Sequence, residues 1–94
     1  MASLRYTERN IHFCSGAIIS ELHILTAGHC LYGQSEYYNK MLVYTGSNTP
    51  GPTFGESHSI FRVHIHPEFR GLLMSKDDIA IITVRYIAKL VYLN

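Results

Sequence analysis

A histidine and an aspartate stand out in the sequence because each lies at the end of an apolar run. His29 is near the end of the segment LTAGHC, in which the small residues Ala27 and Gly28 let the backbone turn and bring the imidazole out at a sheet edge. Asp78 directly precedes the run IAII, where a carboxylate is costly unless it is paired. A histidine is its natural partner, because a carboxylate that accepts one ring N–H fixes the tautomer and leaves the other nitrogen free as a base. The alternative interpretation is a buried ion pair with a purely structural role.

The two cysteines of the chain, Cys14 and Cys30, permit either one disulfide or two free thiols. A disulfide would pin the turn that carries His29, and Cys14 lies in the preceding segment HFCSG, where a hairpin partner would face Cys30. Free buried thiols would be usual in a reducing compartment, and composition leaves both possibilities open. A zinc site of Cys14, His29 and Cys30 lacks a fourth ligand and the C-x-x-C spacing, so we expect no metal there.

Other aromatic and imidazole side chains form two groups along the chain. Three histidines lie in or near one predicted strand: His64 and His66, which are two apart and face the same side, and His58. They suggest a metal site, but histidines on a surface strand are usually solvated, and we expect neither a metal nor another cofactor. Three tyrosines lie in one irregular segment: Tyr32, Tyr37 and Tyr38. They suggest a binding surface, although a loop packed by its own aromatic rings is the simpler interpretation.

The segments that must position these residues read mostly as strands, because apolar and polar residues alternate and β-branched and aromatic residues are frequent. The expected strands are His12–Ser20, Leu22–Ala27, Met41–Thr45, Ile60–Ile65 and Ile79–Val84. Loops are expected at Leu31–Lys40 and Ser47–Gly55, and Tyr86–Asn94 is either a further strand or a linker. Short strands with Gly/Pro turns and no amphipathic helix predict a small all-β antiparallel barrel.

For two of these strands, the sequence also predicts which side chains share a face or are buried. In Ile60–Ile65, the alternation puts Phe61, Val63 and Ile65 on one face and the polar residues on the other. The near-continuous apolar run Ile79–Val84 is typical of a strand that is buried on both faces.

Length and composition exclude several classes of protein. Ninety-four residues form one small domain at most, and 47% of them are apolar, which is enough for a compact core. The formal net charge is +1 with no basic stripe, so we expect no nucleic-acid partner. No apolar run reaches about 18 residues, so no membrane span is expected. The first residues, MASLRYTERN, lack the apolar region of a secretory signal peptide.

Four motifs, in this order, resemble those of chymotrypsin/trypsin-like serine proteases: HFCSG around Cys14, TAGHC ending at Cys30, HPEF from His66, and DIAI from Asp78. The resemblance extends from about Ala2 to Val84. Each motif alone is a weak signal, whereas four of them in order and at similar spacing are a strong one.

The resemblance implies a fold and a set of roles. The fold is the first six-stranded Greek-key barrel of that family, and residues 1–94 form a partial peptidase domain without its C-terminal barrel. His29 is then the general base and acid, Asp78 orients it, and Cys14 and Cys30 form a disulfide. Asp77 is expected to be a solvated neighbour. The implied activity is endoproteolysis of polypeptide substrates, and the implied location is extracellular.

Departures from the family pattern matter equally. The Ile-Val-Gly-Gly-type amino terminus is missing, and none of the eight serines lies in a Gly-Asp-Ser-Gly-Gly motif. The oxyanion hole and specificity pocket belong to the absent half, so we expect a fragment that is inactive alone. The alternative is a non-catalytic half-barrel that binds a protease, an inhibitor or another protein. Glu56 is the one acidic residue near the loop that binds calcium in some relatives, so no calcium is expected, and Gly28 in place of alanine is expected to be a mild change.

Overall fold

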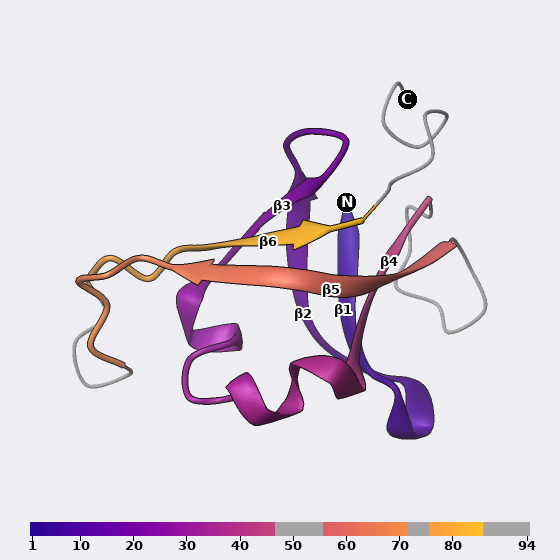
Figure 1. The fold of residues 1–94 in the computed structure, drawn as a ribbon, viewed down its shortest axis with the longest axis horizontal. Helices are drawn as coiled ribbons and strands as arrows, with labels where there is room; N and C mark the ends of the chain where they lie inside the picture. The colour runs from indigo at the N-terminus through magenta and orange to yellow at the C-terminus, as the bar shows by residue number, and fades with distance from the viewer. Residues whose placement is uncertain (47–55, 72–75, 86–94) are drawn as a thin grey trace.

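The computed structural model describes residues 1–46, 56–71 and 76–85 (Figure 1). Six strands form in this part of the chain: β1 (Ala2–Tyr6), β2 (Ile11–Ile18), β3 (His23–Thr26), β4 (Met41–Thr45), β5 (Glu56–Ile65) and β6 (Ala80–Val84). Three short 3-10 helices connect them: η1 (Glu8–Asn10), η2 (Gly28–Cys30) and η3 (Ser35–Lys40). Within the same residues, no helix has the length and apolar content needed to cross a membrane.

The strands close into a barrel in the order β1-β2-β3-β6-β5-β4, with β4 paired back to β1. Every neighbouring pair is antiparallel. The chain therefore runs through β1, β2 and β3 as neighbours, crosses to β4, and fills the remaining gap with β5 and β6, which lie side by side in Figure 1. The predicted all-β, six-stranded antiparallel barrel is confirmed.

The core lies inside this barrel and follows from strand alternation. In β4 and β6, every second residue is buried and its neighbours are half-buried. The side chains of Leu4, Ile24, Val43 and Ile82 are fully buried and come from four different strands. Closure of the barrel thus brings the apolar faces of distant segments into one cluster.

Strand β1 at the amino terminus was not among the expected strands. The candidate strand at Tyr86–Asn94 and the expected loop Ser47–Gly55 lie outside the described residues. The segment Leu31–Lys40 is not an irregular loop throughout, because it contains η3.

Two expectations about strand faces also need correction. A β-bulge between Ile60 and Arg62 interrupts the alternation of β5. Phe61 is consequently 51% exposed, whereas Val63 and Ile65 pack against the core of the barrel. Strand β6 is not buried equally on both faces, because its outward-facing residues are only half-buried.

Candidate active site

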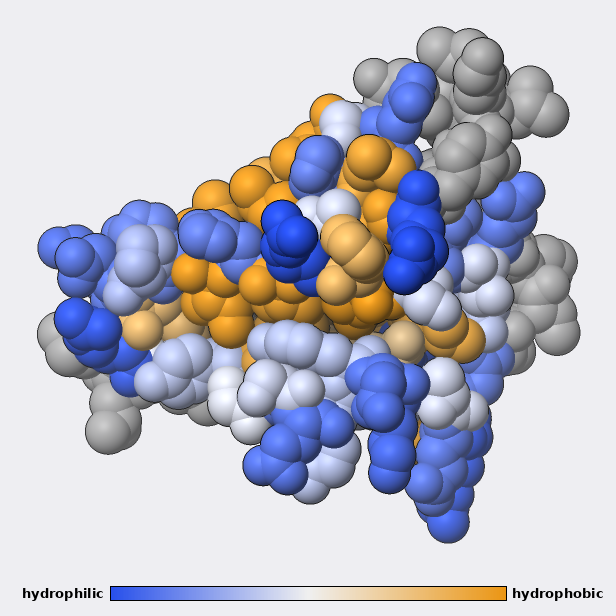
Figure 2. Space-filling model, viewed as in Figure 1, coloured by the Kyte–Doolittle hydropathy of each residue, from blue (hydrophilic) through white to orange (hydrophobic). Residues whose placement is uncertain are grey.

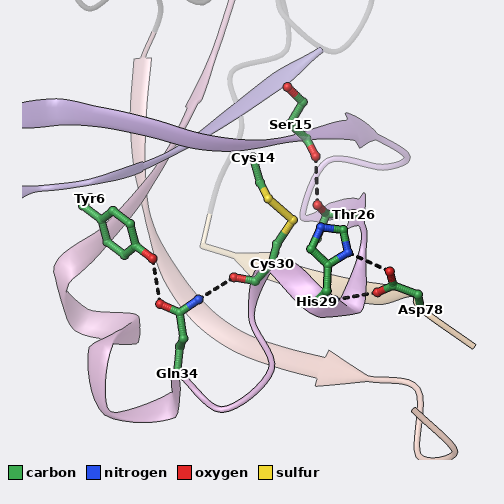
Figure 3. The surroundings of a disulfide bond; sticks show 8 residues. All are labelled: Tyr6, Cys14, Ser15, Thr26, His29, Cys30, Gln34 and Asp78. Carbon is green, nitrogen blue, oxygen red and sulfur yellow. Dashed lines mark hydrogen bonds and ion pairs between the residues drawn. A yellow bond between two sulfur atoms is a disulfide. The ribbon is translucent and has the colours of Figure 1, made fainter. Parts of the chain in front are cut away.

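His29 and Asp78 meet because two paired strands carry them. His29 lies in η2, which follows the end of β3, and Asp78 lies two residues before β6. The pairing of Thr26 with Ala80 brings the end of β3 beside the start of β6. The His29 Nδ1–H donates to Asp78 Oδ2 at 2.7 Å, and the backbone N–H of His29 donates to Asp78 Oδ1 at 2.6 Å (Figure 3). The expected hydrogen bond is therefore present, together with a second one that the sequence did not predict.

Both carboxylate oxygens of Asp78 are thus occupied by one residue, which fixes the position and the rotation of the imidazole. The His29 side chain is 45% exposed and that of Asp78 is 24% exposed. The hydrogen bond from the His29 side chain is the main cause that lowers the pKa of Asp78 below its ordinary value, against a smaller opposing effect of burial. Asp78 therefore stays ionised, and Nε2 of His29 is the ring nitrogen that Asp78 leaves free.

Gly28 allows the close approach of these two segments. A Cβ at this position would lie 3.2 Å from both Asp78 Oδ1 and the backbone nitrogen of Ile79, tighter than an ordinary contact. An alanine at this position would therefore require Asp78 or the backbone of Ile79 to shift by a few tenths of an ångström, and that glycine in place of alanine is a mild change stays a prediction.

The disulfide between Cys14 and Cys30 joins β2 to η2, with the two Cα atoms 6.2 Å apart. The two cysteines are therefore bonded to each other and are not free thiols. The bond also restrains Cys30, which is the residue next to His29. A further support for this segment was not predicted from the sequence. Gln34 Nε2 donates to the carbonyl of Cys30 at 2.8 Å, and the hydroxyl of Tyr6 donates to Gln34 Oε1 at 2.7 Å. Figure 3 shows this chain of hydrogen bonds on the side of the disulfide away from His29. No signal in the sequence marks Gln34, because its role depends on tertiary contacts.

The three histidines considered as metal ligands have different surroundings. His58 is buried and its Nε2 hydrogen-bonds with the hydroxyl of Thr45 at 2.9 Å. His64 is exposed on β5. His66 Nδ1 accepts the backbone N–H of Glu68, and its Nε2 lies 4.0 Å from Asp77 Oδ1. Among the described residues, one group has three potential metal ligands close together: Cys14, His29 and Cys30.

The three tyrosines have different surroundings. Tyr32 packs edge-on against Phe69 of the HPEF motif, with ring centroids 5.1 Å apart. The hydroxyl of Tyr38 donates to the carbonyl of Leu31, and burial raises the pKa of this hydroxyl. Tyr37 remains exposed.

Two serine–histidine pairs were also not predicted. The hydroxyl of Ser3 hydrogen-bonds with His12 Nδ1 at 2.6 Å, and that of Ser20 with His23 Nδ1 at 2.7 Å. In the described part of the chain, neither histidine has a carboxylate within ion-pair distance, so neither pair has the orienting group that His29 has.

Comparisons of the sequence with known proteins point to one family. The protein-family model described as Trypsin matches residues 1–90. The chain is similar to "Trypsin, alkaline A" and "Trypsin, alkaline B" of Manduca sexta, with 36% and 38% identity over 64 residues that cover 68% of this chain and 24% of each relative. It is also 32% identical over 75 residues to "Trypsin" of Phaedon cochleariae, covering 79% of this chain and 28% of the relative.

The chain thus spans about a quarter of the length of these curated relatives. The family match nevertheless covers nearly all of its residues, and the closed six-stranded barrel is the first barrel of the trypsin-like fold. The protein belongs to the trypsin family of serine proteases.

Proposed function

We propose that this barrel supplies the general base and its orienting carboxylate to a serine endopeptidase that hydrolyses peptide bonds in polypeptide substrates. His29 is the base and Asp78 is the orienting group. The nucleophilic serine and the oxyanion hole come from a second barrel outside these 94 residues, because no serine here lies in a Gly-Asp-Ser-Gly-Gly motif. The observation that carries the proposal is the double hydrogen bond from His29 to Asp78.

In each stage of acyl transfer, His29 would first accept a proton and then donate it. Nε2 of His29 takes the proton of the serine hydroxyl as the oxygen attacks the substrate carbonyl. Asp78 stabilises the resulting imidazolium, and its low pKa is consistent with a carboxylate that stays ionised beside it. Nε2–H then donates its proton to the leaving amine. In the second stage, Nε2 takes a proton from a water molecule as the water oxygen attacks the acyl carbonyl. Nε2–H then donates that proton to the serine oxygen as the acyl group leaves it as a carboxylic acid, which restores the serine hydroxyl and the neutral histidine.

The exposed fractions of the side chains around His29 support the proposal that a second protein surface packs against this site. The imidazole of His29 is 45% exposed, and Ile79, which follows Asp78, is 41% exposed. An apolar side chain and a base that are open to water beside each other fit a cleft that another barrel completes. Figure 2 shows apolar side chains gathered over β5 and β6, where Phe61 of β5 is exposed, and large apolar surfaces of this kind usually mark contact sites.

We also propose that the protein works outside the cell. The disulfide beside His29 supports an oxidising environment, because such bonds persist in secreted proteins and are rare in the cytosol.

A chimera tests the proposal. Residues 1–94 replace the matching segment of Manduca sexta alkaline trypsin A, and turnover of a fluorogenic peptide library is measured. We expect hydrolysis by the chimera and none by residues 1–94 alone, since a base without a nucleophile and oxyanion hole cannot form the acyl-enzyme. His29→Ala should abolish turnover, whereas the matched change His64→Ala on exposed β5 should not.

A folded chimera that fails to cleave peptides, or that cleaves them equally well with His29→Ala, would argue against the proposal. That result would favour the alternative of a non-catalytic half-barrel that binds a protease, an inhibitor or another protein.

A further inference from the structure

Three potential metal ligands converge beside the proposed catalytic base. One ring nitrogen of His29 and the sulfur atoms of Cys14 and Cys30 all lie within 4.8 Å of one another. Figure 3 shows the imidazole next to the disulfide, with Asp78 on its other side. We propose that reduction of this disulfide converts the cluster into a binding site for one thiophilic divalent metal ion, with Zn²⁺ as the representative ion.

The ligand set fits zinc chemistry. Two thiolates and one imidazole form the protein part of an open tetrahedral site, and a water molecule takes the fourth position. The missing fourth protein ligand, which argued against zinc in the sequence, is therefore no obstacle to an open site. Asp78 accepts the Nδ1–H of His29, so Nε2 is the nitrogen available to the metal. A carboxylate that holds a ligating histidine in this way is the usual outer-shell partner of zinc.

The geometry requires only local movement. With Zn–S near 2.3 Å and Zn–N near 2.0 Å, ligand atoms in a tetrahedral site lie about 3.5–3.8 Å apart. One ring nitrogen of His29 and both sulfur atoms already lie within 4.8 Å of one another, so small side-chain rotations after reduction bring three ligand atoms to this spacing. The backbone on both sides is held independently of the disulfide, because β2 pairs with β1 and β3, and Gln34 binds the carbonyl of Cys30.

The chemistry balances with an external reductant. A water-soluble phosphine gives two electrons to the S–S bond and becomes its oxide with an oxygen atom from water. The two protons released from that water yield the thiols of Cys14 and Cys30. Metal binding then displaces both thiol protons to solvent.

The consequence for activity rests on the proposed function. A metal ion on Nε2 occupies the electron pair that the base uses, so the metal-bound barrel could not activate a serine. Binding itself does not depend on proteolysis, and the test below therefore remains informative if the proposed function fails.

Cobalt(II) is the probe, because thiolate-bound Co²⁺ gives a charge-transfer absorption. The 94-residue chain is reduced with the phosphine without oxygen and titrated with Co²⁺, then with Zn²⁺ as competitor. We expect one Co²⁺ per chain with thiolate absorption, displaced by Zn²⁺, and no such absorption in the oxidised chain. His29→Gln should weaken binding at least tenfold and Asp78→Asn about tenfold, whereas His64→Gln on exposed β5 should leave it unchanged.

Folding is followed in the same samples by near-ultraviolet circular dichroism. If the reduced chain remains folded, its Co²⁺ affinity should exceed that of the urea-unfolded chain at least tenfold. If it unfolds, metal addition should restore the folded signal, since the binding free energy then drives folding. The proposal is overturned by absent thiolate absorption, by equal affinity in His29→Gln, or by metal binding that is the same in urea and fails to restore the fold.

Discussion

Replacing Cys14 and Cys30 with alanine would remove the one covalent cross-link that the two cysteines of this chain can form. The bond closes a loop between residues separated by 16 positions. In the chain-entropy model, a loop of this size stabilises the folded state by about 3 kcal/mol. A domain of this length has roughly 5–14 kcal/mol of total stability, so the loss is a large share of it.

Urea denaturation of the wild type, both single variants and the double variant measures this effect. With a urea m-value of about 1–3 kcal/mol/M, we expect the midpoint of the double variant to fall by about 1–3 M. Either single substitution already opens the loop, so each should cost nearly as much as both together. Single effects that add up to the double effect would refute the reasoning, because they would show lost packing rather than a lost cross-link.

Further predictions concern the glycines and the carboxylate. Gly16→Ala should destabilise the barrel by about 1–3 kcal/mol in urea denaturation, because the added Cβ would lie 2.6 Å from Ile24 Cγ2; no loss would contradict this packing. Gly28→Ala should cost less, since its closest contacts would be at 3.2 Å; a larger loss than for Gly16→Ala would contradict the comparison. The lowered pKa of Asp78 predicts that its stabilising contribution is complete above the ordinary value of 3.8 and disappears as pH falls through the lower folded value. The stability difference between wild type and Asp78→Asn should therefore shrink in acid, and a difference that is constant with pH would contradict the His29 hydrogen bond as its cause.

The hydrogen bond between the side chains of His29 and Asp78 was predictable from the types and sequence surroundings of the two residues. A carboxylate at the mouth of an apolar run needs a partner, and the motifs around both residues supplied the match. The bond from the backbone N–H of His29 to Asp78 was not predictable, because it depends on how η2 turns after β3. The same holds for the close approach at Gly28, which only the packed segments reveal.

Strand β1 was missed for a physical reason. A register shift between Leu4 and Arg5 makes both residues buried, which breaks the alternation that identifies strands. Arg5 is only 3% exposed, and its guanidinium donates to Ser3 and to the carbonyl of Asn10. A buried arginine in a strand carries no apolar signal, so its position follows only from tertiary hydrogen bonds. The bulge between Ile60 and Arg62 in β5 breaks the alternation in the same way, and Phe61 was therefore expected on the same face as Val63 and Ile65.

The central claim is that Asp78 orients His29 as the base of a peptidase. The most direct measurement is the kcat of the trypsin chimera with Asp78→Asn, compared with Asp77→Asn as the matched control. Asp77 has a φ of 61°, a conformation that asparagine tolerates, and its carboxylate is 4.0 Å from His66 rather than His29. We predict that Asp78→Asn lowers kcat by about 10⁴-fold, the loss seen for this change within the family rather than one worked out from this barrel, while Asp77→Asn stays within a fewfold. A loss below about tenfold for Asp78→Asn, or equal losses for both variants, would contradict the account.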